Sequence, residues 1–184
     1  MESLEEKIAR VLKDRIELSP YSTRWPKLFE EEKQHLRSLF PETIGKIEHF
    51  GSTAVPGLWA KPVVDILVEI PSLDEAEKMI VPVLEQQGYD YFKRSVRDDK
   101  QPPFYAWFIK RDANGVRTHH LHMVEADSEL WKRLLFRDYL IAHPATAWAY
   151  QELKLRLALE ASGDRIAYTR GKTEFVNKIT LLAK

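Results

Sequence analysis

The pattern of hydrophobic residues predicts a sheet of short strands flanked by helices. Residues 63–70 (VVDILVEI) are apolar on both faces, so we expect a central strand that is covered on both sides. Shorter alternating or apolar runs predict further strands at 15–18, 44–50, 89–92, 104–109 and 116–125. The Asn114-Gly115 step between the last two runs is typical of a β-hairpin turn.

Apolar residues at helical spacing predict helices at 3–13, 26–39, 74–87, 129–142, 145–161 and 170–182. We interpret the first as packed on the body of the protein, with a homodimer contact as the alternative. Together the elements indicate an α+β fold, a mixed β-sheet with helices packed on it and a C-terminal helical cover. For 184 residues we expect a single domain, 1–184, with an N-terminal helix at 1–14, an α/β core at 15–125 and C-terminal helices at 129–182.

Composition narrows the range of functions. The chain has no cysteine, which excludes structural disulfides, thiolate zinc sites and cysteine nucleophiles. Its 28 Lys and Arg balance 28 Asp and Glu, so general nucleic-acid binding is not expected, whereas a local basic pocket for a phosphate is compatible with the charge. No run approaches the ~20 apolar residues of a membrane span, and the N-terminus lacks a secretory apolar region. We therefore expect a cytoplasmic protein with no membrane partner.

The segment 47–70 carries the main chemical signal. A strand ends at Gly51-Ser52, a loop containing Lys61 follows, and Asp65 then lies inside a hydrophobic strand. Gly51 allows the backbone to approach a phosphate, and Ser52 offers a hydroxyl and an amide. A carboxylate among apolar neighbours is costly without a partner, and a divalent ion such as Mg²⁺ would supply one. The segment predicts a phosphate and metal site, with Lys61 placed to meet a phosphate charge.

A second candidate cluster lies at 117–125, RTHHLHMVE. On a strand, His120 and His122 project from one face about 7 Å apart. If this strand lies near the strand of Asp65, the three residues form a two-His, one-carboxylate set, which suits zinc, manganese or iron better than magnesium. The alternative is that the histidines hydrogen-bond backbone groups or Asp65 and bind no metal.

Both segments resemble those of known families. A Gly-Ser step followed by a strand with acidic residues is similar to the nucleotidyltransferase superfamily. The whole chain, over residues 16–182, resembles the GrpB family of bacterial proteins through YSTRWPKLFEEEK, GSTAVPGLWAKPVVDILV, RTHHLHMVE, LLFRDYLIAHPATAWAYQELK and AYTRGKTEFVNKI. The resemblance implies a nucleotidyltransferase-like fold. GrpB-like domains also occur fused to dephospho-CoA kinase, which points towards nucleotide or coenzyme A metabolism.

One position departs from the superfamily pattern. Its second acidic residue would fall at position 67, which is Leu67 here. Glu69 shares the face of Asp65, but four residues along a strand span about 13 Å, too far to hold the same ion. Two-metal phosphoryl transfer needs ions ~4 Å apart with several carboxylates, which Asp65 alone does not provide.

Four basic residues are candidates for a phosphate pocket, each with a solvated surface charge as the alternative: Arg94, Arg97, Arg117 and Lys172. The Gly171-Lys172-Thr173 sequence is not the end of a P-loop, because the position of the first glycine is Ile166.

Three functional hypotheses follow. The first is a nucleotidyltransferase-like protein that binds a nucleotide or other phosphate-bearing ligand with a divalent metal (Mg, Mn or Zn). Its catalytic candidates are Ser52, Asp65, His120 and His122, and its ligand-binding candidates are Gly51, Ser52, Lys61, Arg117 and Lys172. The second is a non-catalytic nucleotide- or coenzyme-binding module, which Leu67 favours. The third is a metal-dependent hydrolase that uses Asp65, His120 and His122.

Overall fold

A five-stranded mixed sheet forms the centre of the structure, a computed structural model that describes residues 4–13, 17–97, 100–161 and 164–184. The strand order is β1-β2-β5-β4-β3, with bounds Ile47–Phe50 for β1, Val64–Glu69 for β2, Asp90–Ser95 for β3, Phe104–Arg111 for β4 and Arg117–Val124 for β5. β2 and β5 pair in parallel, and the other neighbouring strands are antiparallel. The mixed sheet confirms the predicted fold class, and the apolar run at 63–70 supplies an interior strand.

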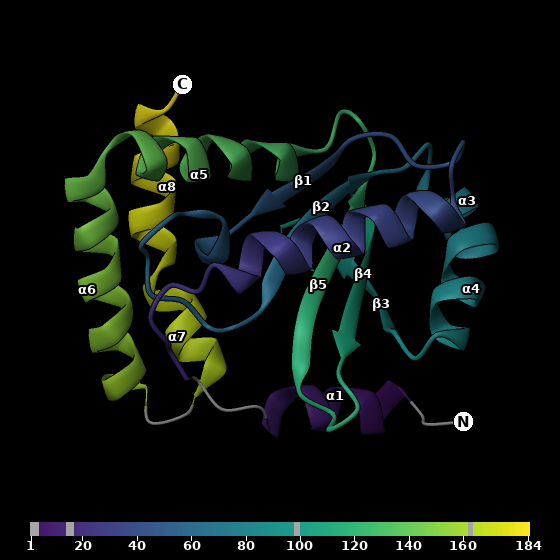
Figure 1. Ribbon diagram of the computed structural model, residues 1–184, viewed down its shortest axis with the longest axis horizontal. Coiled ribbons are helices and arrows are strands. Elements are labelled where there is room, and N and C mark those ends of the chain that lie inside the picture. The colour runs from purple at the N-terminus through teal and green to yellow at the C-terminus, as the bar shows by residue number, and fades with distance from the viewer. Residues whose placement is uncertain (1–3, 14–16, 98–99, 162–163) are drawn as a thin grey trace.

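One face of the sheet is covered by α2 (Arg24–Leu39) and by a helical segment at 73–86. Ile66 of β2 and Leu121 of β5 are buried there against Leu36 and Leu84. The segment at 73–86 consists of α3 (Leu73–Glu75), a π-helical turn η2 (Ala76–Ile80) and α4 (Val81–Gln86). Figure 1 shows α2 crossing in front of the strands, so this layer separates them from solvent on that side.

The opposite face of the sheet carries Asp65, His120 and His122. Leu67 and Phe50 on this face pack against Leu130 of η3 (Glu129–Lys132) and Leu134 of α5 (Arg133–Ala142). The chain continues through α6 (Pro144–Glu160), α7 (Arg165–Gly171) and α8 (Thr173–Leu182), which gather at one end of the sheet in Figure 1. Among the described residues, no helix combines the length and apolarity needed to cross a bilayer.

The N-terminal helix α1 (Leu4–Lys13) contacts the rest of the chain through ion pairs. Lys7 Nζ lies 2.9 Å from Glu85 of α4, and Arg10 lies 2.7 Å from Asp90 of β3. These contacts agree with a helix that packs on the body of the protein.

Three element predictions require correction. Of the strand expected at 15–18, residues 15–16 lie outside the described residues, and 17–18 are not in a strand; only Ser19 forms a single bridge, to Ala60. The helix expected at 74–87 contains the π-helical turn, which precedes Pro82, a residue without the N–H that a regular helix requires. The helix expected at 170–182 is two helices, because Asp164 caps a start at Arg165 and the chain turns at Lys172.

His49 lies where β1 meets α2. Its ring stacks on Phe29 with 5.0 Å between ring centroids, and its Nε2 is 3.0 Å from Thr53 Oγ1. Burial, only partly offset by the charge of Asp65, lowers the pKa of His49 to about 4. The unfolded chain takes up this proton near pH 6.5, so the stabilisation is fully present above that pH and is lost as the pH falls. Between pH 7 and pH 4, we expect His49 alone to remove about 3 kcal/mol from the free energy of unfolding.

Urea unfolding of the wild type and of His49→Gln at a series of pH values measures this contribution. The variant lacks the titrating ring, so its stability should decline less steeply over the same pH interval. Equal slopes for the two proteins would contradict the burial of a neutral imidazole between β1 and α2.

Candidate functional site

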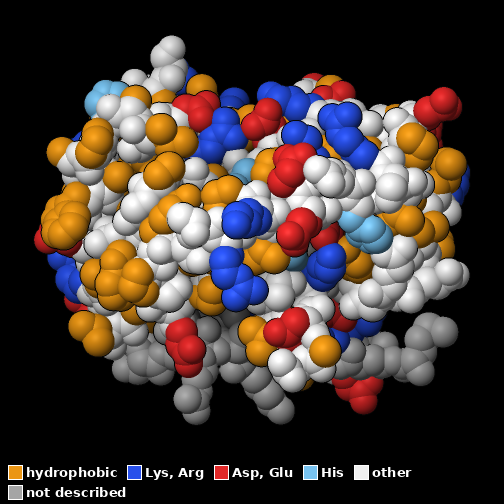
Figure 2. All heavy atoms as spheres, in the orientation of Figure 1, with side chains coloured by type: hydrophobic (Ala, Val, Ile, Leu, Met, Phe, Trp, Pro, Cys, Tyr) orange, Lys and Arg blue, Asp and Glu red, His pale blue; other side chains and the backbone are white. Residues whose placement is uncertain are grey.

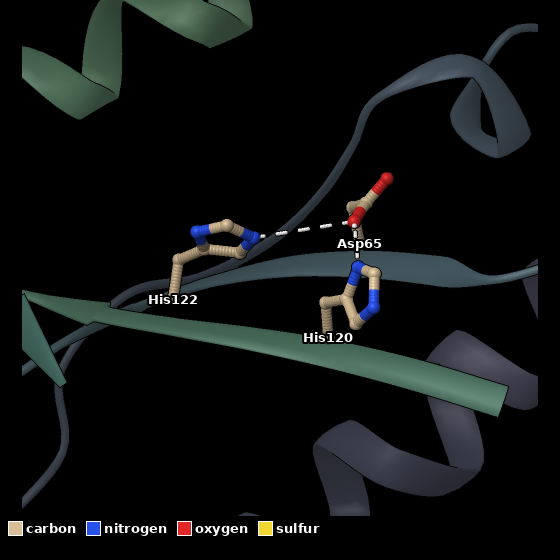
Figure 3. A group of neighbouring side chains, drawn as sticks. All are labelled: Asp65, His120 and His122. Carbon is tan, nitrogen blue, oxygen red and sulfur yellow. Dashed lines mark hydrogen bonds and ion pairs between the residues drawn. The ribbon is translucent and has the colours of Figure 1, made fainter. Parts of the chain in front are cut away.

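Asp65, His120 and His122 meet on one face of two adjacent strands. The parallel register of β2 and β5 pairs Asp65 with His120 and Leu67 with His122. Because side chains alternate along a strand, all four point to the same face. Asp65 Oδ1 lies 3.0 Å from His120 Nδ1 and 4.0 Å from His122 Nε2, and Figure 3 shows the carboxylate facing both imidazole rings.

The donor atoms of these three residues lie close enough together to converge on one divalent ion. One carboxylate oxygen and two imidazole nitrogens lie within 4.8 Å of one another. Metal binding requires a neutral imidazole, and burial holds the pKa of His122 well below its usual 6.5. Two imidazoles with one carboxylate suit manganese, zinc or iron better than magnesium. The 3.0 Å contact between His120 and Asp65 is equally what a hydrogen bond between them requires.

Aromatic rings fix the orientation of His122. Its ring stacks on Tyr105 with 5.6 Å between centroids and meets the edge of Phe50 at 5.1 Å. Its Nδ1 is buried and has no hydrogen-bond partner within the described part of the chain. The ring contacts are therefore what orients His122, with its Nε2 4.0 Å from Asp65 Oδ1.

Gly51 permits the close approach of the Ser52 turn to Asp65. Its φ of 73° and ψ of −170° fall in a region that is almost restricted to glycine. A Cβ at this position would lie 2.6 Å from Asp65 Oδ2, closer than any real contact. The 3₁₀ turn η1 (Ser52–Ala54) begins immediately afterwards, so the glycine allows this turn to lie directly beside the carboxylate.

Gly51→Ala is expected to lower the free energy of unfolding by about 1–3 kcal/mol and to weaken metal binding, because the new methyl group displaces Asp65. Gly57→Ala is the matched control, since Gly57 has a φ of 78° but open space where its Cβ would be. Chemical denaturation and Mn²⁺ titration of both variants provide the comparison. If the two variants were equally stable and bound Mn²⁺ equally well, the proposed contact with Asp65 would be wrong.

A cavity of about 890 Å³ joins the two sequence segments that carry the chemistry. It is lined by seven of the eight predicted site residues, namely Ser52, Lys61, Asp65, Arg117, His120, His122 and Lys172, while Gly51 lies directly beside Asp65. Glu17 and Asp65 are the acidic residues in its lining. Against them stand seven basic residues: Lys61, Arg94, Arg117, Arg133, Lys154, Arg170 and Lys172.

The cavity is therefore strongly cationic in a chain whose formal charge is zero. Figure 2 shows a different distribution on the face that α2 covers, where Lys and Arg side chains are interspersed with Asp and Glu. Positive charge concentrated in a concave site favours an anionic ligand.

Of the basic residues predicted for a phosphate pocket, all but Arg97 line this cavity. Arg94 lines the cavity with its guanidinium 4.8 Å from the centroid of Trp107. Arg97 does not line it, and its exposed guanidinium instead lies 3.3 Å from Glu129. The chain turns away after β3 ends at Ser95, which carries Arg97 out of the cavity.

Lys154 is the principal cavity residue that the sequence did not indicate. It projects from α6 and is 2% exposed, and its Nζ donates hydrogen bonds to Ser52 Oγ at 3.1 Å and to the carbonyl of Trp59. Burial, followed by the charge of Lys172, lowers the pKa of Lys154 to about 7. The available signal was its place four residues after Tyr150, on the same helical face as a buried aromatic ring.

The structure is similar to solved structures of other proteins. The structure is similar to terminal uridylyl transferase 4 from Trypanosoma brucei with bound dUTP, with a TM-score of 0.51 and 12% identity over 77% of this chain and 47% of that chain, which shows the nucleotidyltransferase fold. It matches the crystal structure of the conserved protein GrpB from Enterococcus faecalis with a TM-score of 0.78 and 32% identity over 91% and 96% of the two chains.

The sequence comparisons agree. The glutamate-rich protein GrpB of Alkalihalophilus pseudofirmus is 38% identical over 170 residues, which is 92% of this chain and 96% of that protein. The family model described as GrpB protein matches residues 15–181. The chain therefore belongs to the GrpB family.

Proposed function

We propose that this protein is a nucleotidyltransferase-like enzyme that binds the phosphates of a nucleotide in the cationic cavity, beside one divalent ion held by Asp65, His120 and His122. The observation that carries the proposal is the shared cavity, which brings the Asp-His-His cluster together with Ser52, Lys61, Arg117 and Lys172. A ligand with several negative charges matches this lining.

Different residues of the cavity offer different chemical groups to the ligand. Lys61, Arg117 and Lys172 offer positive charge and N–H donors to phosphate oxygens. Ser52 offers a hydroxyl at the start of the turn that follows Gly51. When bound, a divalent ion would supply charge neutralisation at the phosphates. Catalysis of this type depends chiefly on positioning and electrostatic stabilisation.

A non-catalytic nucleotide- or coenzyme-binding module is the second candidate, and Leu67 favours it. Leu67 is completely buried and packs against Phe50 and Leu134, so the position has become part of the hydrophobic core. With one carboxylate on this face at the site, a two-metal arrangement has no second anchor. This candidate predicts affinity for the ligand without turnover.

Calorimetric titration with ATP, GTP, CTP and UTP, each with Mg²⁺ or Mn²⁺, tests the proposal. At least one nucleotide is expected to bind in a metal-dependent manner, with higher affinity in the presence of Mn²⁺ than of Mg²⁺. Absence of binding to all four would overturn it. Release of pyrophosphate during incubation would identify an enzyme, whereas a binding module would release none. If pyrophosphate is released, Asp65→Asn should reduce the rate of its release by orders of magnitude. Hydrolysis with water as the acceptor would instead indicate the metal-dependent hydrolase.

A further inference from the structure

Lys154 is buried, and within the described part of the chain its ammonium group donates hydrogen bonds to neutral groups. Its two hydrogen bonds go to the hydroxyl of Ser52 and the carbonyl of Trp59, and its Nζ lies 4.9 Å from the ring centroid of Tyr150. Burial raises the pKa of both Tyr150 and Tyr168, so these phenols are not anions near neutral pH. A buried charge without an opposite charge is unfavourable, and a bound anion would relieve that cost.

The position of Lys154 is fixed by the helix that carries it. One turn earlier on α6, Gln151 Oε1 accepts a hydrogen bond of 2.8 Å from the backbone N–H of Trp59. Gln151 and Lys154 thus hold the N–H and the carbonyl of the same residue in the loop between Ser52 and Asp65. The ammonium group is therefore oriented before any ligand arrives, which lowers the entropic cost of binding.

Two further lysines approach the same part of the cavity. The Nζ atoms of Lys61 and Lys172 each lie 4.4 Å from the ring centroid of Tyr168, a residue of α7 that also lines the cavity. The charge of Lys172 is one of the causes that lower the pKa of Lys154, so these ammonium groups repel one another. Lys61 from the loop, Lys154 from α6 and Lys172 from the α7–α8 junction all line this cavity, where a polyanion would offset the repulsion between Lys154 and Lys172.

We propose that Lys154, Ser52, Lys61 and Lys172 form an anion subsite distinct from the Asp65-His120-His122 cluster, which takes the outer phosphates of a ligand with a phosphate chain, a nucleoside di- or triphosphate. The assignment to a nucleotide rests on the proposed function, whereas the anion subsite does not. A ligand with one phosphate occupies the metal cluster or the subsite but not both, so it binds more weakly.

Binding of inorganic tripolyphosphate in the presence of EDTA isolates the subsite from the metal cluster. Lys154→Met should weaken this binding by about 10-fold or more, the value of one hydrogen bond to a charged group. Asp65→Asn removes a negative charge from the same cavity, so it should not weaken this binding. Lys132→Met is the surface control, because Lys132 lies outside the cavity and pairs with Glu129 at 4.0 Å. With Mn²⁺ present, Lys154→Met should weaken the binding of ATP and ADP but change the binding of AMP little.

The outcomes separate the subsite from the proposed function. Tripolyphosphate binding that depends on Lys154, with no binding of any nucleotide, would support the subsite and overturn the nucleotide proposal. Nucleotide binding that Lys154→Met leaves unchanged, or weakens equally for ATP and AMP, would overturn the subsite alone. If Lys154→Met fails to fold, Lys154→Gln keeps a polar group near Trp59 without the charge, and Lys172→Met tests the same subsite from a more exposed position.

Discussion

Asp65→Asn is expected to weaken Mn²⁺ binding by about 100-fold or more, because changes to groups that merely support a metal ligand already cost about 10–100-fold. Asparagine keeps the shape of the side chain but removes the negative charge that faces His120 and His122. Its amide oxygen is a weaker ligand, and the two imidazoles alone make an incomplete site. Mn²⁺ titration followed by electron paramagnetic resonance measures the affinity directly.

Glu69→Gln is the matched control for this variant. Glu69 lies on the same strand and the same face, but it contacts Gly45 and does not line the cavity. The control should bind Mn²⁺ as the wild type does. Asp65→Asn protein that folds normally and keeps wild-type Mn²⁺ affinity would show that the cluster is a hydrogen-bonded structural group.

Leu67→Asp is expected to destabilise the protein by about 3–5 kcal/mol instead of completing a two-metal site, because it buries a charge with no partner. Leu67 has no exposed surface and is packed by Phe50, Val124 and Leu134. Its neighbour in the register is His122, and burial lowers the pKa of that imidazole, so the position offers no standing positive charge to a new carboxylate.

Leu67→Asn separates the charge from the loss of packing, since both substitutions remove the same apolar side chain. Urea denaturation should show Leu67→Asp to be clearly less stable than Leu67→Asn at neutral pH. An Asp variant as stable as the Asn variant, with two Mn²⁺ ions bound per chain, would mean that the second acidic position remains functional in this fold.

The sequence indicated the sheet well because strand periodicity is local. The apolar run at 63–70 and the Asn114-Gly115 hairpin both appear where they were predicted. The C-terminal helices were harder, since Asp164 caps a helix through its side chain in a segment with few apolar residues. The π-helical turn at Ala76–Ile80 likewise leaves no trace in the spacing of hydrophobic residues.

The site was partly predictable for a similar reason. Asp65, His120 and His122 lie on strands, where side-chain direction follows from alternation once the strands are known to be adjacent. The parallel pairing of β2 with β5 joins residues more than fifty positions apart, which no local pattern reveals. Lys154 was missed because a lysine in a charged helix is ordinarily solvated, and only the tertiary packing of α6 on the Trp59 loop buries it.

We propose that the Asp-His-His cluster and the cationic cavity receive one ligand together. Electron–nuclear double resonance of Mn²⁺ bound with a nucleoside triphosphate tests it most directly. The spectrum should show coupling to ¹⁴N of the imidazoles and to ³¹P of the phosphates in the same complex. Coupling to ³¹P without coupling to ¹⁴N would place the ion on the nucleotide and away from His120 and His122, and would contradict a shared site.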